Sequence, residues 1–387
     1  MKILVLASDN PSPPINGTRI RNFHLWNEVR KAGHEVKLLC ITRDPKDLEL
    51  NNNEIEFFLF TRKNILNRIW NRLMRSYHEW PVSDSLENRV KVLVEMWNPD
   101  YIHAEELRMG HYLPSLTNGP INSLCAHNVE SELLKKTLAA PFPFAVMLFN
   151  SIYRFNLKRF EKKMIRKTHI RFTYSEVDRK IYENLYPGHP WSTSSNGVNE
   201  ISLSQQEQEL PPPQKLLFLG SLGYAPNIEG LFWFLDEVYP KVKSKIELTV
   251  AGSFAPAKVI EKLSQMGVNY VGSPTDLRSV YVPNSMLLVP LLSGSGTRGK
   301  ILEALMYNRA VLTTTIGVEG LELPGNNGVL IADGAQEYAQ AILDWLEMNP
   351  ALRKNLADRG REAVMSRYTW RKVAKDITNS WQQLLNK

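Results

Sequence analysis

The sequence predicts an α/β protein built from two doubly wound, Rossmann-like domains that face a cleft. Three observations carry this expectation. The chain has 387 residues, too many for one ordinary core; apolar strand-like runs alternate with helical patterns in both halves; and a polar, proline-rich stretch separates the halves. We expect a first domain over residues 1–204, a linker over 205–214, a second domain over 215–368, and a final helix over 369–387 that crosses back to the first domain.

The first half begins with a buried strand over Lys2–Ala7, a turn-rich loop that reaches Gly17, and a helix from about Thr18 to Lys31. No G-x-G-x-x-G follows the strand, so a dinucleotide fingerprint is absent. Further along, His127 follows the predicted strand Ile121–Ala126, at the strand end where open α/β sheets bind ligands. A lone histidine is more often structural, so both interpretations of His127 stay open.

The stretch QQEQELPPPQ marks the boundary between the halves, because three consecutive prolines cannot lie inside a sheet and make a semi-rigid linker. The strand and helix alternation restarts at Leu216 and runs to the strand near Ala310. From Ala335 onward the patterns are helical. The last helix has an apolar side long enough to cover part of the first domain, formed by Trp370, Val373, Ile377, Trp381 and Leu384.

A glycine-rich loop after the strand Met286–Pro290 is the most informative stretch of the second half. It reads SGSGTRGK and leads into a helix with two cations, Arg298 and Lys300, at its start. Glycines, backbone N–H groups and the positive end of a helix together favour a bound phosphate. The alternative is a surface loop in which Lys300 pairs with Glu303. The stretch is not a P-loop, because G-x-x-x-x-G-K-[ST] is absent.

The composition describes a soluble globular chain, with 43% hydrophobic and 22% charged residues. Cys40 and Cys125 lie in apolar runs and are expected to be buried thiols in a reducing compartment. The chain shows neither a signal segment nor an apolar run of spanning length, so we expect a cytoplasmic protein.

The net charge of +7 lies mostly before Glu200, which favours an anionic partner for the first half. Nucleic acid is a poor candidate because no zinc-finger, RNP or basic-zipper pattern occurs. Two basic amphipathic helices, over 62–80 and 144–167, suggest peripheral contact with the anionic inner surface of a membrane. The alternative is that both are ordinary packed helices with a solvated basic face.

In this order, several motifs resemble those of the retaining, nucleotide-sugar-dependent glycosyltransferases of the GT-B fold, in particular glycosyltransferase family four. The resemblance covers nearly the whole chain and is strongest in the second half. It rests on the motifs NGTRIRNFHLWNEVRKAGHEV, AHNVESELL, NGVN at Asn196, FLGS at Phe218, PN at Pro226, VAG at Val250, and SGSGTRGKILEALMYNRAVLTTTIGVEGL.

The resemblance implies a role for each matching residue. Arg298 and Lys300 would hold the donor diphosphate, and Glu303, the second glutamate of the E-x7-E motif, would bind the ribose hydroxyls. His127 would face the donor sugar, and Glu319 would approach the nucleotide. The remaining expected donor-binding positions are the glycine and hydroxyl residues of the matching loops: Gly17, Gly220, Gly294, Ser295, Gly296 and Thr297.

The chain departs from the family pattern in two places. The first glutamate of E-x7-E falls at Ser295, so its contact with the donor sugar is missing or is made by loop N–H groups. The usual Arg and Lys after the first strand of the second domain are also absent, which leaves the diphosphate to Arg298 and Lys300. No Asp-x-Asp occurs, so we expect neither a metal nor another cofactor.

The implied activity is transfer of a sugar from a nucleotide-sugar donor to a hydroxyl of a glycan, lipid-linked or other acceptor, with retention at the anomeric carbon. Cations at the leaving phosphate would lower the barrier, and that phosphate would take the acceptor proton. The alternatives are a nucleotide-sugar epimerase or a phosphorylase of the same fold, and a non-catalytic sugar-nucleotide-binding regulator. The base, the sugar and the acceptor are not encoded in any pattern that we identify.

Overall fold

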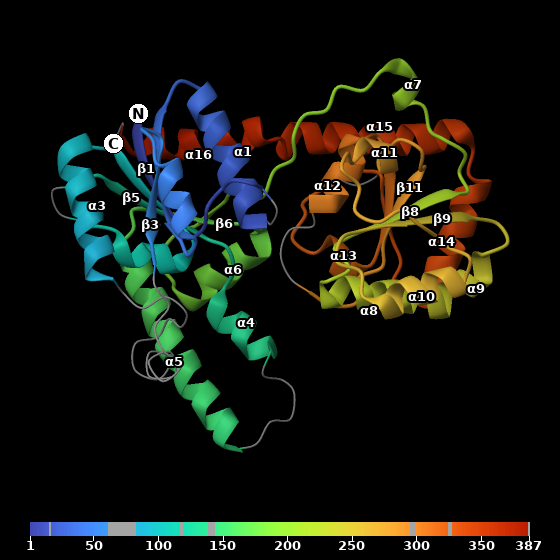
Figure 1. The fold of residues 1–387 in the computed structure, drawn as a ribbon, viewed down its shortest axis with the longest axis horizontal. Helices are drawn as coiled ribbons and strands as arrows, with labels where there is room; N and C mark the ends of the chain where they lie inside the picture. The colour runs from blue at the N-terminus through green and yellow to red at the C-terminus, as the bar shows by residue number, and fades with distance from the viewer. Residues whose placement is uncertain are drawn as a thin grey trace. The chain divides into compact units, whose positions relative to one another are not determined.

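The structure is a computed structural model that describes residues 1–14, 17–60, 83–116, 119–137, 144–294, 299–323 and 327–385. It divides into two compact units, one formed by Met1–Ser195 with Val373–Lys387 and the other by Asn196–Lys372. Each unit contains one parallel β-sheet with helices packed on it (Figure 1). The prediction of two doubly wound α/β units is therefore confirmed.

The first unit has a seven-stranded sheet in the order β3-β2-β1-β4-β5-β6-β7. Strand β1 pairs in parallel with β2 on one side and β4 on the other, so that Val5 lies between Leu38 and His103. Because the strand order reverses between β1 and β4, ligands are expected at the carboxyl ends of these two strands. The strands are β1 (Lys2–Ala7), β2 (Glu35–Thr42), β3 (Ile55–Leu59), β4 (Tyr101–Glu105), β5 (Ile121–Ala126), β6 (Ile170–Thr173) and β7 (Ser192–Thr193).

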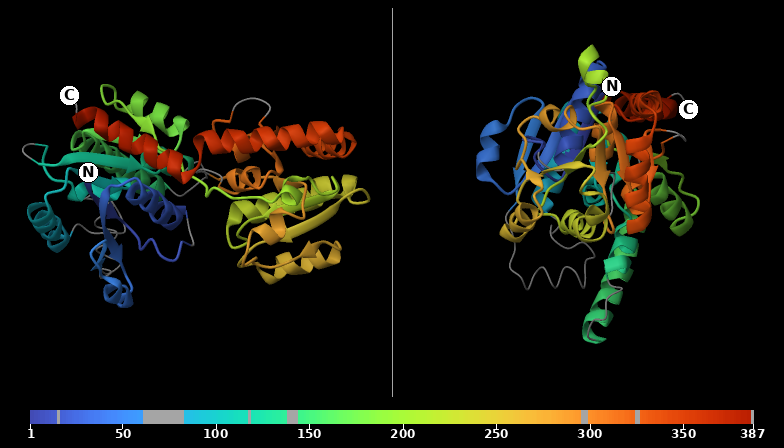
Figure 2. Two further views of the ribbon diagram at one scale, coloured as in Figure 1. Left: turned by 90° about the horizontal axis from the view of Figure 1, so that it is seen from above. Right: turned by 90° about the vertical axis from the view of Figure 1, so that its right-hand side faces the viewer.

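Helices connect these strands, and serine N-caps fix the starts of two of them. The Ser83 hydroxyl accepts from Leu86 N–H at the start of α3, and the Ser175 hydroxyl accepts from Asp178 N–H at the start of α6. Helix α5 extends beyond the sheet of its unit, with α4 packed beside it (Figures 1 and 2). The helices are α1 (Gly17–Lys31), η1 (Pro45–Leu50), α3 (Asp84–Trp97), η2 (Leu107–Tyr112), α4 (Glu130–Thr137), α5 (Phe144–Arg166) and α6 (Glu176–Leu185).

The last helix, α16 (Trp370–Leu385), completes the core of the first unit. Trp381 is fully buried, and its ring stacks on Trp26 at 6.1 Å and on Tyr101 at 5.4 Å between centroids. Its indole N–H donates to the Ser123 hydroxyl at 3.1 Å, and the Tyr101 hydroxyl donates to its carbonyl at 2.8 Å. The predicted return of the final helix to the first domain is confirmed.

The second unit has a six-stranded sheet in the order β10-β9-β8-β11-β12-β13, which reverses between β8 and β11. Its strands are β8 (Lys215–Leu219), β9 (Glu247–Ala251), β10 (Asn269–Tyr270), β11 (Met286–Val289), β12 (Ala310–Thr313) and β13 (Val329–Ile331). Its helices are α7 (Gln205–Gln208), α8 (Ala225–Trp233), η3 (Phe234–Val238), α9 (Tyr239–Val242), α10 (Ala257–Gln265), α11 (Arg278–Tyr281), α12 (Gly299–Met306), α13 (Thr315–Val318), α14 (Ala335–Glu347) and α15 (Pro350–Arg367).

The stretch expected to be a linker lies within the second unit, whose first residue is Asn196. Residues Gln205–Gln208 form the short helix α7, which begins with a capping box between Ser204 and Glu207. The Glu207 carboxylate also pairs with Arg278. The backbone carbonyl of Glu207 accepts a hydrogen bond from Arg309 at 3.0 Å. The polar side chains that resembled a solvated linker thus bind this segment to its own unit.

The described helices include none with the length and apolar character needed to span a membrane.

Candidate active site

Lys300 lies in the first turn of α12, and its ammonium is held next to the end of β8. Lys300 Nζ donates to Asn227 Oδ1 at 2.9 Å, while Asn227 Nδ2 donates to the Ser221 carbonyl at 2.9 Å. The absence of a side chain at Gly220 makes room for this pair, because a Cβ there would lie 2.8 Å from Lys300 Nζ. A cation therefore stands at the reversal of the strand order, where doubly wound sheets bind ligands.

Asn227 is a site residue that the sequence analysis did not single out, although its motif was noted. Its amide oxygen positions the ammonium, and its amide nitrogen holds the turn after β8. Its position in the first turn of α8, after Pro226, is the signal that was present in the sequence.

Glu303 lies three residues after Lys300 and contacts one of two stacked tyrosines, Tyr281 and Tyr307. The Tyr281 hydroxyl lies 3.2 Å from Glu303 Oε2 and 3.2 Å from the Lys300 carbonyl, and the Tyr281 ring stacks on Tyr307 at 4.8 Å. Burial raises the pKa of the Glu303 carboxyl, although Tyr281 and Lys300 act in the opposite direction. Tyr281 therefore holds the carboxyl of Glu303 in a fixed place, while the residue as a whole is half-buried.

The glycine loop between β11 and α12 is attached to α8 on both sides. Before the loop, the Ser293 hydroxyl donates to Glu229 Oε2 at 2.6 Å, and after it Lys300 bonds to Asn227. Gly294 has φ +109°, a conformation that side-chain-bearing residues rarely adopt. The predicted site residues of the loop itself, Ser295, Gly296, Thr297 and Arg298, lie outside the described residues.

Glu319 lies after the short helix α13, which follows the carboxyl end of β12, and its side chain is exposed. The N-cap Thr314 accepts from Gly317 N–H at 3.0 Å, and a Cβ at Gly317 would lie 2.0 Å from Thr313 Oγ1. The structure thus places Gly220, Gly294, Lys300, Glu303 and Glu319 at the same edge of the second sheet, and it brings Gly220 and Lys300 into contact.

In the first unit, a buried ion pair underlies the predicted histidine. Arg21 and Glu105 both have fully buried side chains, with Arg21 Nε 3.2 Å from Glu105 Oε1. Arg21 also donates to the Ser195 carbonyl at 2.8 Å and to Ser194 Oγ at 2.9 Å. Burial alone would raise the pKa of Glu105, but the Arg21 charge and hydrogen bonds from two histidines hold it well below its usual range. These contacts favour the ionised form of Glu105.

His127 is oriented by this carboxylate. Its Nε2 lies 3.0 Å from Glu105 Oε2 and 2.5 Å from the Tyr174 hydroxyl, and the two rings stack at 4.1 Å. Its Nδ1 lies 3.8 Å from Glu106 Oε1, and the ring remains partly exposed. An imidazole fixed in this way can offer a hydrogen bond or carry a proton toward a ligand.

Glu106 extends the same group of side chains at the end of β4. It has φ +80°, a strained conformation for any residue other than glycine. Its carboxylate accepts from the Ser8 hydroxyl at 2.6 Å and pairs with Arg108. The sequence analysis did not identify Glu105 and Glu106; two adjacent acids directly after an apolar strand were the available signal. Gly17, the remaining predicted residue, begins α1 and is exposed.

The residues near His127 do not fit a metal ion. Glu105, Cys125 and His127 bring three potential ligand atoms within 4.8 Å of one another. However, Arg21 bonds to both Glu105 and Cys125, at 3.2 and 3.6 Å, and its charge opposes a second cation. Burial also raises the pKa of the Cys125 thiol, which disfavours the thiolate that a metal requires.

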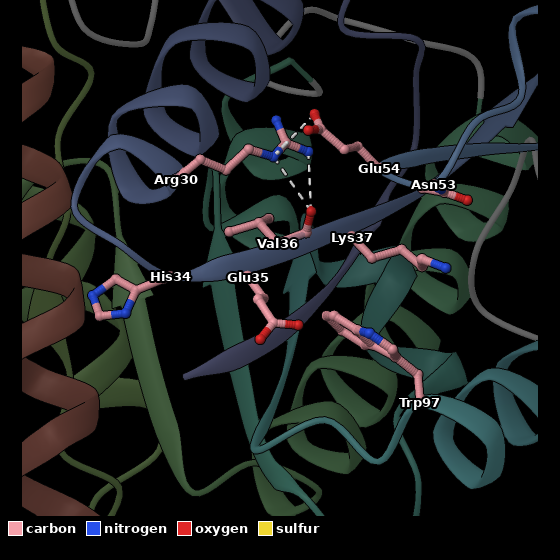
Figure 3. Close-up of a pocket in the computed structure, with 8 residues that line it drawn as sticks. All are labelled: Arg30, His34, Glu35, Val36, Lys37, Asn53, Glu54 and Trp97. Carbon is pink, nitrogen blue, oxygen red and sulfur yellow. Dashed lines mark hydrogen bonds and ion pairs between the residues drawn. The ribbon is translucent and has the colours of Figure 1, made fainter.

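A pocket of about 490 Å³ opens at the other edge of the first sheet (Figure 3). Arg30 crosses it and donates to the Val36 carbonyl at 3.1 Å, with Glu54 Oε2 3.4 Å away. The ammonium of Lys37 lies 5.8 Å from the Trp97 ring. Because Glu35 and Val36 begin β2, the pocket lies at the amino ends of the strands, away from His127 and Glu105.

Solved structures with the same architecture define the class of fold. The chain is similar to sucrose-phosphate synthase from Thermosynechococcus elongatus, with a TM-score of 0.70 and 16% identity over 100% of both chains. It is also similar to HepE of Anabaena solved with UDP, with a TM-score of 0.68 and 13% identity over 99% of this chain and 100% of that one. The fold is therefore GT-B.

The family comparison concerns the second unit. Residues 213–348 match the family Glycosyl transferases group 1. Over 97% of its length the chain is 24% identical to an uncharacterised 44.6 kDa protein in the cps region of Klebsiella pneumoniae, covering 98% of that protein. It is 22% identical to an uncharacterised glycosyltransferase of Methanocaldococcus jannaschii over 44% of this chain and 46% of that one. Residues 213–348 of the second unit are therefore similar to Glycosyl transferases group 1, in a chain whose fold is GT-B.

Proposed function

We propose that the chain transfers a glycosyl group from a nucleotide-sugar donor to a hydroxyl of a sugar or lipid-linked acceptor, with retention at the anomeric carbon and without a metal. The observation that carries this proposal is the Lys300 ammonium, which Asn227 holds against the side-chain-free turn at Gly220. A cation fixed at the carboxyl ends of β8 and β11 suits a diphosphate, since it is preorganised where charge develops on the leaving group.

The other residues of the second unit complete this assignment. Arg298, two residues before Lys300, supplies a second cation to the diphosphate, and Glu303 accepts hydrogen bonds from the ribose hydroxyls. Backbone N–H groups of the loop at Ser295 replace the missing first glutamate of the motif. We assign Glu319, which follows α13, a contact with the nucleotide. The departing diphosphate takes the acceptor proton in a front-face reaction.

In the first unit, we assign His127 a hydrogen bond to the donor sugar. The support for this role is that Glu105 and Tyr174 fix the ring while leaving it partly exposed. Arg21 keeps Glu105 ionised, so the histidine always has an acceptor at Nε2.

The donor nucleotide is best sought first among uridine diphosphates. HepE of Anabaena was solved with UDP and glucose, and TarM of S. aureus was solved with UDP and alpha-GlcNAc-glycerol. A thermal-shift screen against UDP, GDP, ADP and TDP sugars identifies the donor, because a ligand that binds the native state stabilises it by mass action.

Arg298→Ala and Lys300→Ala test the diphosphate site once the donor is known. Each is expected to lower kcat by roughly a hundredfold or more, as removal of one transition-state donor does. Lys258→Ala is the matched control, since Lys258 is an exposed lysine on α10 of the same unit. Near-normal turnover in both site variants would refute the assignment, and donor binding without turnover over an acceptor panel would favour a regulator.

The proposed metal independence has a separate test. Activity should persist in excess EDTA, because two protein cations take the place of a bound ion at the diphosphate. Abolition by EDTA with rescue by Mn²⁺ would overturn this part of the proposal.

Peripheral contact with an anionic membrane is supported by helix α5. Ile152 and Phe155 are 41% and 61% exposed, and the Arg159 guanidinium lies 5.7 Å from the Phe155 ring. Further along, five cations line a cavity of about 400 Å³: Arg159, Lys162, Lys163, Arg166 and Lys167. Apolar side chains beside a cationic cluster suit a negatively charged lipid surface. The other basic stretch, 62–80, lies outside the described residues.

Liposome sedimentation tests this contact. The protein should bind vesicles containing anionic lipid at low salt and be released as salt rises. Phe155→Ser should weaken retention, whereas Met365→Ser, at a 45% exposed site of the second unit, should not. No retention at low salt would rule out the membrane contact and point to a soluble acceptor.

A further inference from the structure

Two exposed aromatic side chains lie beside the Lys300 site and have no role in the function proposed above. Tyr224 follows the turn after β8 and is 47% exposed, and Phe254 follows β9 and is 82% exposed. Both strands end at the sheet edge that carries Gly220 and Lys300. Since β8 and β9 are neighbours in the sheet, the two aromatic residues occupy adjacent loops at this edge.

Phe254 is placed unfavourably for an ordinary surface residue. Its φ of +58° lies in the left-handed region, which a bulky side chain seldom adopts and which glycine or asparagine tolerates better. Its ring gains little from burial, because most of it is in water. Neither the backbone nor packing therefore accounts for an aromatic residue at this position, which favours a role in binding.

The loops that carry the two rings are joined to each other and to the Lys300 site. Leu222 N–H donates to the Ser253 carbonyl at 2.8 Å, and a Cβ at Gly223 would lie 3.0 Å from Phe254 Cβ. A Cβ at Gly252 would lie 1.9 Å from the Gly220 carbonyl, so the loops after β8 and β9 are in direct contact. Gly220 in turn adjoins Lys300 Nζ.

This arrangement gives the direction in which a ligand bound at Lys300 would extend to meet Phe254. The Lys300 ammonium lies beside Gly220, which follows β8, and Phe254 follows the neighbouring strand β9, roughly 5 Å away across a sheet. A nucleoside diphosphate held at Lys300 by its phosphates has a flat, aromatic base at the other end of its ribose, and Phe254 offers an exposed ring three residues beyond the end of β9. An exposed aromatic ring is the side chain on which a base stacks.

We propose that Phe254, with Tyr224 next to it, is the stacking platform for the nucleobase of the donor. This inference rests on the proposed function, since it requires the diphosphate to bind at Lys300. A base that stacks on a ring is recognised by its flat face, so the platform supplies affinity for the nucleotide without selecting one base.

Three substitutions at one position test the platform by titration calorimetry with UDP, GDP, ADP and inorganic pyrophosphate. Phe254→Asn removes the ring and suits the left-handed backbone. It should weaken the best nucleoside diphosphate about tenfold, within the range for loss of one base–aromatic stack, and leave pyrophosphate binding unchanged. Phe254→Tyr keeps a ring and should bind like the wild type. Phe254→Ala should weaken nucleotide binding as Phe254→Asn does.

Thermal denaturation separates this role from a structural one. Phe254→Asn should keep or raise Tm, because it relieves the unfavourable φ, while it loses nucleotide affinity. Ile260→Ala, at a 44% exposed position of α10, is the matched control and should bind all four ligands normally. Unchanged nucleotide affinity in Phe254→Asn, or an equal loss for pyrophosphate, would overturn the platform alone. A wild-type protein that binds no nucleoside diphosphate would overturn the proposed function as well.

Discussion

The first unit buries its candidate charges completely among partners inside the fold, whereas the second unit leaves its candidate charges half-buried. Arg21 and Glu105 have no exposed side-chain surface, and further polar groups of the same unit bind them, among them Ser194, Ser195 and His127. Lys300 and Glu303 remain partly exposed, and glycines at positions 220 and 294 keep side chains away from the sheet edge that they share.

This difference shows that charge at a strand end serves two purposes in one molecule. In the first unit the charges orient one another, and their removal is expected to harm the fold first. In the second unit the Lys300 ammonium is positioned by the Asn227 amide, and removal of this cation is expected to harm ligand binding first. Replacing a cation by an apolar residue should therefore lower mainly the stability in the first unit and mainly the ligand affinity in the second.

The largest effect is expected for Arg21→Met. It leaves Glu105 as an uncompensated buried carboxylate, so the free energy of unfolding of the first unit should fall by about 3–5 kcal/mol. Lys300→Met, as the matched variant of the second unit, should change it by less than about 1 kcal/mol. Urea denaturation followed by tryptophan fluorescence measures both. Equal losses in the two variants would contradict the distinction between the units.

A smaller effect, confined to activity, is expected for Gly220→Ala. The added Cβ would lie 2.8 Å from Lys300 Nζ and 2.9 Å from Asn227 Nδ2, so both side-chain ends must move while the charge is kept. We expect kcat to fall about tenfold, since the loss of position costs less than the loss of a whole donor, with Tm nearly unchanged. Gly267→Ala, in a turn with φ +69° far from the site, should show the reverse: lower Tm and normal kcat.

The smallest effect is the pH dependence of the free energy of unfolding, to which Glu105 and Glu303 contribute with opposite signs. The pKa of Glu105 is far below its unfolded value of about 4.3, so its stabilising contribution is complete above that pH and is lost as the pH falls through the folded pKa. The pKa of Glu303 is raised by burial, so the folded state takes up a proton first and its stability increases as the pH falls toward about 4.3.

Urea titrations between about pH 3 and pH 7 measure these slopes. Glu303→Gln should remove the gain on acidification, and Glu105→Gln should remove the loss at the lowest pH while also lowering stability at neutral pH. A Glu303→Gln slope identical to that of the wild type would show that Glu303 titrates normally.

The sequence predicted the second site better than the first, for a physical reason. Lys300 and Gly220 belong to a local pattern of strand, glycine turn and helix start, whose function depends on neighbours in the chain. Glu105 depends on Arg21, which is 84 residues away in sequence, and on the depth at which both are buried. His127 was identified by its strand-end position, but the network that orients it is formed by tertiary contacts alone.

The expected linker over residues 205–214 also differs from the structure because of tertiary contacts, since the second unit begins at Asn196. Composition distinguishes a polar segment from an apolar one, but it does not show whether the polar groups bind water or one another. In residues 205–208, polar groups bind Ser204 and Arg278. A stretch with the composition of a linker therefore forms part of a folded unit.

The position of Trp381 also determines when the core of the first unit can be completed during synthesis. Trp26 and Tyr101 leave the ribosome early, but the ring that covers them comes from α16, after every residue of the second unit has been translated. Domains generally fold as units during synthesis, beginning at the N-terminus. Here the first unit to be synthesised is the last to be completed. The apolar surface around Trp26 and Tyr101 stays uncovered until α16 has been translated.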